Sequence, residues 1–140
     1  MGNTIIMGFI LSYISLILFV LVYLLDEIVM LFVGVKGRKW YQLSAQRKYT
    51  KAFTVDVFGN YLFGDFWNFI WSKGGYRFGI FGETLSSCLG RKKAENTLNW
   101  FGMIFYYVLY VVDFSKWKYG GHCFNAIMSE VEIKEFLKRR

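Results

Sequence analysis

A run of residues without any charge, from Thr4 to Leu25, most constrains what this chain can fold into. Isoleucine, leucine, phenylalanine and valine dominate the run. An α-helix rises about 1.5 Å per residue, so about 20 apolar residues cross the roughly 30 Å of bilayer hydrocarbon while satisfying their own backbone hydrogen bonds. The sequence therefore predicts a transmembrane helix within residues 1–34.

A cleaved signal peptide is the alternative for an apolar N-terminal run. Signal peptides carry basic residues before a short apolar core and end at a small-residue cleavage site. Here Met1, Gly2 and Asn3 are uncharged, and Asp26 and Glu27 follow the run. We expect the segment to be retained as an anchor. N-myristoylation is not expected, since Ile6 stands where that motif needs Ser or Thr.

The first helix is predicted to extend past the apolar run. Residues 28–33 remain apolar, and Gly34 and Gly37 are natural terminators. A helix over residues 4–33 is about 45 Å long, so it either tilts in the bilayer or emerges from it. We interpret Asp26 and Glu27 as a solvated helix face, with pairing to the basic residues downstream as the alternative.

Six basic residues follow the predicted helix in segment 35–53, with no acidic residue between them. Positively charged segments stay on the cytoplasmic side, so the expected topology is N-terminus out and bulk of the chain in. The same residues are candidates for contact with anionic lipid headgroups, at about 1 kcal/mol each. They also explain much of the net charge of +7 without a nucleic-acid partner. These residues are Lys36, Arg38, Lys39, Arg47, Lys48 and Lys51.

Residues 54–128 form a predicted helical domain that is unusually aromatic, in a chain with 21% Phe, Trp and Tyr. Trp and Tyr favour the headgroup region of a bilayer. The segment 55–71 predicts a helix whose apolar face packs in the core or at the interface: Phe58, Leu62, Phe66, Phe69 and Ile70. The predicted fold class is mainly α, with this aromatic domain at the membrane surface.

Residues 98–112 form a second strongly apolar stretch. It is short for a membrane span, and basic residues flank it on both sides. We expect a helix buried in the domain or lying at the interface; a second crossing is the alternative.

Glycines and a helix cap divide the rest of the domain. Gly74, Gly75, Gly79 and Gly82 predict one flexible loop, and Gly120 and Gly121 predict another. Residues 76–81 allow a short extended piece, and no periodic set of strands is seen. Residues 129–140 predict an amphipathic helix with a capping box formed by Ser129 and Glu132.

Three polar motifs occur in the aromatic domain. They are the pair Asp65 and Asn68 in D-F-W-N, the block E-T-L-S-S-C-L-G-R over residues 83–91, and the pair His122 and Cys123. In this order they resemble a small family of uncharacterised bacteriophage and prophage proteins, over about residues 60–127. The resemblance implies a phage-encoded accessory or membrane protein and brings no activity with it.

The same motifs contain the residue types of a hydrolase: Glu83, Ser86, Ser87, His122 and Cys123. An acid can orient a histidine that activates a nucleophile, but no G-x-S-x-G elbow is present. The favoured interpretation is a structural polar network, because buried polar groups need partners. Its expected members are Asp65, Asn68, Glu83, Thr84, Ser86, Ser87, Arg91 and His122.

Metal and cofactor sites are not expected. Glu83, Cys88, His122 and Cys123 supply ligand types, but no paired-ligand spacing supports zinc. A disulfide between the two cysteines requires an oxidising compartment, whereas the predicted topology is cytoplasmic.

We therefore expect a single-span membrane protein that acts by protein or lipid contact, with a protein partner or a second copy of the chain. Roles that fit are a component of the virion or host inner membrane, a superinfection-exclusion factor, or an accessory to lysis. The alternative is a small membrane-bound hydrolase using the acidic, serine, histidine and cysteine residues above.

Overall fold

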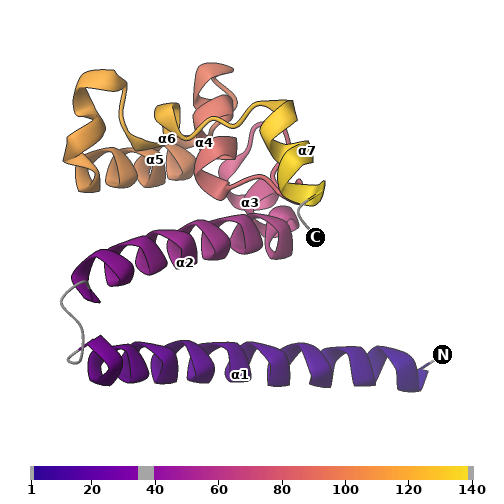
Figure 1. Cartoon of the computed structure of the whole chain (residues 1–140). Helices are drawn as coiled ribbons and strands as arrows, with labels where there is room; N and C mark the ends of the chain where they lie inside the picture. Colours follow the sequence, from indigo (N-terminus) through magenta and orange to yellow (C-terminus); the bar gives the residue numbers. More distant parts are fainter. Residues whose placement is uncertain (1, 35–39, 139–140) are drawn as a thin grey trace. The chain divides into compact units, whose positions relative to one another are not determined.

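The computed structural model describes residues 2–34 and 40–138, and its regular structure in these ranges is helical. The only β-type pairing within them is an isolated bridge between Ser72 and Leu98. Residues 76–81 are irregular, so the short extended piece is not a strand. The prediction of a mainly helical chain is confirmed (Figure 1).

Helix α1 (Gly2–Gly34) covers the predicted anchor and ends at the predicted glycine. Its stretch Ile6–Val29 is long and apolar enough to cross a membrane, and none of that stretch is buried within the protein. Within residues 6–25 exposed aliphatic and aromatic side chains occur on every side of the helix, which is typical of a buried or membrane-spanning helix.

The chain divides into two compact units at a point inside helix α2 (Trp40–Leu62). Unit 1 ends at Tyr49 and unit 2 begins at Thr50. Part of segment 35–53 is therefore helical, which the sequence interpretation did not include. Lys36, Arg38 and Lys39 lie outside the described residues.

The basic residues of α2 are accessible. Arg47 and Lys48 are exposed and Lys51 is half-buried. Their contact with lipid headgroups stays a prediction.

The single helix predicted over 55–71 is wrong, because α2 ends at Leu62 and α3 (Gly64–Trp71) starts anew. The cause is a contact distant in sequence: a Cβ on Gly64 would lie 2.5 Å from the Cα of Gly79. Two glycines thus let backbone touch backbone at the start of α3. A packing requirement of this kind leaves little trace in local periodicity.

Most of the apolar face predicted for this segment does not pack in the core, and Ile70 is the member that packs against it. Phe58, Leu62 and Phe66 are about half exposed, and Phe69 is 87% exposed. The buried positions are Val57 and Asn60 of α2 and Gly64 and Trp71 of α3. Of the two predicted alternatives, only the interfacial one agrees with these exposures.

Unit 2 completes its fold with four more α-helices and one 3₁₀-helix in the described residues (Figure 1). Helix α4 packs against α6, and α3 packs against α5. Indole and phenyl rings stack in the core, with centroids 4.3 Å apart for Trp67 and Trp71 and 4.5 Å for Trp71 and Phe105. The elements are α4 (Leu85–Ala94), α5 (Trp100–Val112), η1 (Phe114–Tyr119), α6 (His122–Asn125) and α7 (Glu130–Lys138).

Helix α5 is too short to cross a bilayer. Its 13 residues extend about 20 Å, less than the roughly 30 Å of hydrocarbon. The Asn99 side chain caps its first turn by accepting from the Gly102 amide. Gly102 and Tyr106 are buried, so one side packs on the domain and the alternative of a second crossing is not supported.

The C-terminal helix starts at the predicted capping box. The Ser129 amide donates to Glu132 Oε2 at 2.7 Å, and the Glu132 amide donates to Ser129 Oγ at 3.2 Å. This reciprocal pair satisfies two amides that have no partner inside the helix. The glycine loops are confirmed too: all six predicted loop glycines have positive φ.

At Gly90 helix α4 lies close to the backbone of α6. A Cβ built at this position would lie 2.2 Å from the carbonyl oxygen of Cys123 and 2.8 Å from the Ile127 side chain. Since the first of these atoms is backbone, a rotamer change cannot relieve the contact. Gly59 in α2 has nothing within 4 Å of its Cβ position.

We therefore expect Gly90→Ala to destabilise unit 2 and Gly59→Ala, the matched control, to leave it unchanged or stabilise it by up to about 1 kcal/mol through helix propensity. The measurement is thermal unfolding of the full chain in detergent micelles, followed by near-ultraviolet circular dichroism. Equal stability of the two variants would contradict the close α4–α6 packing.

Candidate functional site

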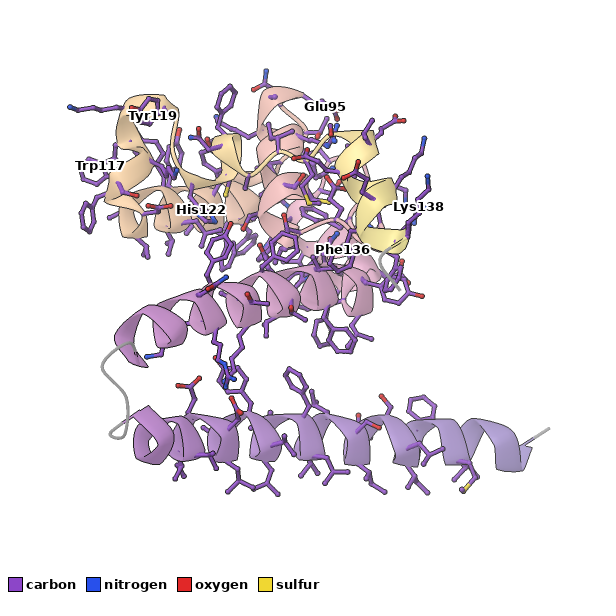
Figure 2. The ribbon with its side chains drawn as sticks, in the orientation of Figure 1. Glu95, Trp117, Tyr119, His122, Phe136 and Lys138 are labelled. Atoms are coloured by element: carbon purple, nitrogen blue, oxygen red, sulfur yellow. The ribbon has the colours of Figure 1, made fainter. Side chains whose placement is uncertain are left out.

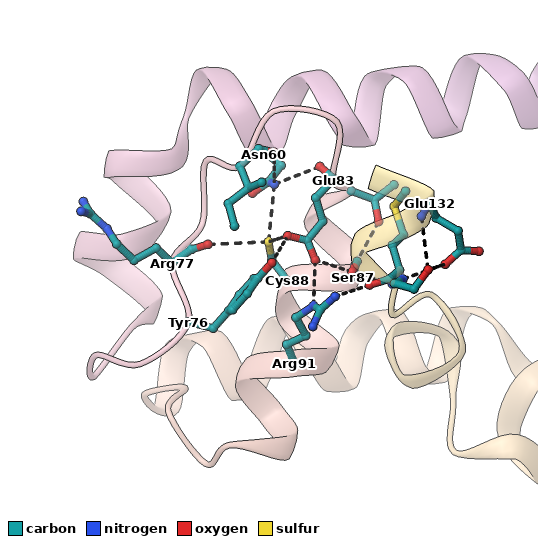
Figure 3. A network of polar contacts seen from close by, with 12 residues as sticks. Asn60, Tyr76, Arg77, Glu83, Ser87, Cys88, Arg91 and Glu132 are labelled. Carbon is teal, nitrogen blue, oxygen red and sulfur yellow. Dashed lines mark hydrogen bonds and ion pairs between the residues drawn. The ribbon is translucent and has the colours of Figure 1, made fainter. Parts of the chain in front are cut away.

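A fully buried carboxylate lies at the centre of unit 2 (Figure 3). The Glu83 side chain has no exposed surface and lies two residues before the first residue of α4. Each of its oxygens receives two hydrogen bonds. Oε1 accepts from Ser87 Oγ at 2.6 Å and Arg91 Nε at 3.1 Å, and Oε2 accepts from Tyr76 OH at 2.6 Å and Cys88 Sγ at 3.2 Å.

Residues far apart in sequence meet around this carboxylate. Asn60 of α2 donates to the Glu83 carbonyl at 2.9 Å and accepts from the Gly79 amide at 3.1 Å. Ser87 Oγ accepts from the Met128 amide at 2.9 Å, and Arg91 donates to the Met128 carbonyl. We call Asn60, Tyr76, Glu83, Ser87, Cys88 and Arg91 the Glu83 network.

The charge of Glu83 is balanced by one cation. Arg91 forms the ion pair, and its side chain keeps 24% of its surface exposed. Burial, followed by the hydrogen bond and charge of Glu83, raises the pKa of Tyr76. Burial and the Glu83 charge likewise raise the pKa of Cys88. Phenol and thiol therefore stay protonated and act as donors, so the network stabilises the fold and offers no free nucleophile.

The remaining predicted network residues make separate contacts. Thr84 caps α4 by accepting from the Ser87 amide at 3.1 Å, and Ser86 donates to Asp56 Oδ2 at 2.8 Å. Asn68 exchanges hydrogen bonds of 3.0 Å with the backbone of Phe78. These hydrogen bonds join neighbouring segments of unit 2, and none of them is made to the Glu83 side chain.

The prediction that Asp65 belongs to the polar network is wrong. Its side chain is fully exposed, and its ion-pair partner is Arg77 at 3.9 Å, which is itself mostly exposed. A long pair at high exposure contributes little to stability. Asp65 occupies the first turn of α3, where a carboxylate favours the positive end of the helix.

His122 also lies outside the network. Its Nδ1 is 2.8 Å from Asp113 Oδ2, which joins the start of α6 to the end of α5. Hydrogen bonds from Ser115 and His122 lower the pKa of Asp113. The pair is partly exposed, at 38% for the histidine side chain and 27% for the aspartate.

The residues proposed for a hydrolase are thus divided among different partners. Ser87 bonds to Glu83, Ser86 to Asp56, and His122 to Asp113. Each serine hydroxyl donates directly to a carboxylate, and no histidine lies between them to take its proton, as a serine nucleophile requires. The arrangement provides three hydrogen-bonded pairs and not one relay.

Several residues of this interior were not predicted. Lys92 is fully buried, and its ammonium donates to the carbonyls of Gly74 and Tyr76. Burial lowers the pKa of Lys92 and also raises that of Asp56. In sequence Lys92 belongs to the basic run 91–93, which resembles a solvated helix face. Only the folded 74–76 loop distinguishes it from its neighbours.

Both cysteines are free thiols in the core. Burial raises the pKa of Cys123 to about 12. In the described residues no group of three His, Cys, Asp or Glu side chains is arranged to hold a metal ion. Cys88 donates to Glu83, while His122 is occupied with Asp113.

The outer side of α5 is the second notable feature of unit 2. An open apolar groove of about 830 Å³ runs along it, with Lys73, Asn99 and Met103 among its lining. The exposed residues recur every three or four positions, so they form a single stripe along the helix. We call them the α5 stripe: Trp100, Phe101, Ile104, Tyr107, Val108, Val111 and Val112.

Glu83→Gln is expected to lower the free energy of unfolding by about 1.5–3 kcal/mol, because the amide loses the charge that Arg91 and the donors stabilise. Chemical unfolding in detergent micelles measures the free energy of unfolding of both chains. Asp65→Asn, at the exposed carboxylate, is the matched control and should change stability little. A Glu83→Gln variant as stable as Asp65→Asn would refute the central role of the network.

The two thiols should resist alkylation in the folded chain. With Cys123 at a pKa of about 12 and Cys88 raised as well, the thiolate fraction at mildly alkaline pH is negligible and rises only as the pH approaches these values. Mass spectrometry after maleimide treatment should show no adduct on the folded protein and two on the denatured protein. Rapid labelling of either cysteine in the folded state would contradict the packing.

Comparisons of the chain with models of protein families, with curated proteins and with solved structures give no match. The described residues offer two features on which function can be built. One is a hydrogen-bonded interior, the Glu83 network; the other is an apolar exterior on α1 and the α5 stripe.

Proposed function

We propose that this chain is a membrane-anchored accessory or structural protein that acts by contact with lipid and protein, and not by catalysis. The observation that carries the proposal is the contrast between interior and exterior. In the described part of the chain every buried side-chain nitrogen and oxygen has a hydrogen-bond partner. Large apolar side chains meanwhile remain exposed along α1, α3 and α5. Extensive exposed apolar surface is typical of membrane or protein interaction sites.

Helix α1 supports the anchor. Its apolar stretch Ile6–Val29 is not buried within the described structure, and a bilayer would cover the uncharged part of it, up to Leu25. Fifteen residues, 35–49, lie between the end of α1 and unit 2. Even fully extended they reach about 50 Å, so an anchored α1 keeps unit 2 near the membrane.

The hydrolase alternative has less support. Its serines each donate to a carboxylate, and Cys123 is 1% exposed with a raised pKa. The pair of His122 and Asp113 is the one element of that alternative with the geometry of an oriented base. Without an adjacent nucleophile, a contact function accounts for more of the molecule.

Location and sidedness are parts of the same proposal. The basic residues at 36–51 favour the cytoplasmic side for the bulk of the chain. The resemblance of residues 60–127 to phage and prophage proteins favours the host inner membrane or the virion membrane. A virion component, a superinfection-exclusion factor and a lysis accessory all fit such a protein.

Alkaline carbonate extraction of bacterial membranes that contain the full chain tests the anchor. The double variant Ile17→Arg/Leu18→Arg places two charges at the middle of the predicted span, at about 2.5–3.5 kcal/mol each. We expect the unsubstituted chain to stay in the membrane pellet and this variant to be released. Ile17→Leu/Leu18→Ile is the matched control and should remain in the pellet.

Purification in mild detergent from infected cells and from virions then tests the contact function. A stoichiometric protein partner, or a defined oligomer of this chain, supports it. In the carbonate extraction, a doubly charged variant that stays in the membrane pellet would refute the anchor. Loss of biological effect in a folded His122→Ala chain that keeps its membrane and protein contacts would favour the hydrolase alternative.

A further inference from the structure

We propose that the α5 stripe, together with η1, binds anionic phospholipid with helix α5 lying in the plane of the membrane. The proposal rests on the proposed function, because the anchor α1 brings unit 2 to the bilayer. The surface is the α5 stripe with η1. The partner is a lipid with a negatively charged headgroup, and its acyl chains contact the stripe.

The first support is the division of α5 into two apolar sides. Gly102 and Tyr106 are buried, and Met103, Phe105 and Leu109 pack against the core. The α5 stripe on the other side is 50–69% exposed at each residue. The inner side is enough to hold the helix on unit 2, so the outer side needs an apolar environment that unit 2 does not provide.

The shape of the surface is the second support. The groove along the α5 stripe is open and shallow, and among the residues that line it Lys73 is the only charged one. Asn99, which caps the helix, is its other polar lining residue besides the Tyr107 hydroxyl. Fluid acyl chains fill such an uneven surface without a specific complementary shape.

Cations at both ends of the stripe are the third support. Lys73 lies beside the first turn of α5, and Lys116 and Lys118 follow its last turn in η1. Apolar residues between basic residues are typical of helices that lie in a membrane interface and attract anionic lipids. Asp113, the carboxylate directly after α5, is 2.8 Å from His122 and hydrogen-bonded by Ser115.

Aromatic residues accompany these cations. Trp117 and Tyr119 of η1, both labelled in Figure 2, are 48% and 66% exposed, and the Trp117 indole stacks on Tyr110 of α5. Trp100 stands at the opposite end of the stripe and is 63% exposed. Tryptophan and tyrosine favour the headgroup level of a bilayer, so they would hold both ends of α5 at the same depth.

Site-directed labelling of the full chain in nanodiscs tests the proposal. The native thiols are buried, so a maleimide fluorophore reports on one introduced cysteine. Val108→Cys lies mid-stripe, Lys134→Cys lies on exposed α7, and Leu16→Cys lies in the anchor. The probe is quenching by phosphatidylcholine that carries a spin label on its acyl chain, in discs with and without phosphatidylglycerol.

We expect the label at 108 to be quenched severalfold more than the label at 134, and more strongly when phosphatidylglycerol is present. Lys116→Glu/Lys118→Glu should remove the extra quenching that the anionic lipid causes. Near-ultraviolet circular dichroism of each labelled chain shows whether unit 2 remains folded.

Two outcomes overturn the proposal while the proposed function stands. In both, the label at 16 is quenched, which reports an inserted anchor. In the first, the label at 108 is quenched no more than the label at 134. In the second, quenching of the label at 108 is the same with and without phosphatidylglycerol and is not changed by Lys116→Glu/Lys118→Glu. This result would refute the anionic lipid as the partner. An unquenched label at 16 would instead overturn the anchor, and the proposed function with it.

Discussion

The fold of unit 2 depends on satisfying one buried carboxylate. An ionised carboxyl group removed from water is costly unless charge and hydrogen bonds replace its hydration. Glu83 receives four donors from a loop and from α4, and Asn60 and the segment at Met128 are bonded to the same network. Helix α2, the loop at residues 76–83, α4 and the segment at Met128 are thereby held in one arrangement. In a small domain with a modest core, such a network specifies which loops and helices meet.

Local signals explain what the sequence predicts correctly. The uncharged run, the helix over 98–112 and the capping box at Ser129 depend on residues within a few positions of one another. Ser87 and Arg91 were placed in the network beside Glu83, and their spacing of four puts them on one side of α4. The fold class and the core of the polar site were therefore predictable.

Contacts between distant residues explain what the sequence could not predict. The break between α2 and α3 follows from Gly64 touching Gly79, and the burial of Lys92 follows from the loop carbonyls above it. Asn60 resembles any polar residue of an exposed helix until the loop at Gly79 closes over it. Asp65 differs from Asn60 and Lys92 in the opposite direction. Its motif predicted a place in the polar network, but its side chain is fully exposed to solvent.

The bond between Ser87 and Met128 also orders events during synthesis. Glu83 and α4 are made well before Met128, yet Ser87 and Arg91 complete their hydrogen bonds only with that residue. Unit 2 therefore cannot close its polar interior until nearly all of the described chain exists. Helix α1 precedes unit 2 in the chain, and its backbone hydrogen bonds lie within the helix itself. A nascent chain of this protein accordingly carries a complete apolar helix ahead of a domain whose polar interior is still open.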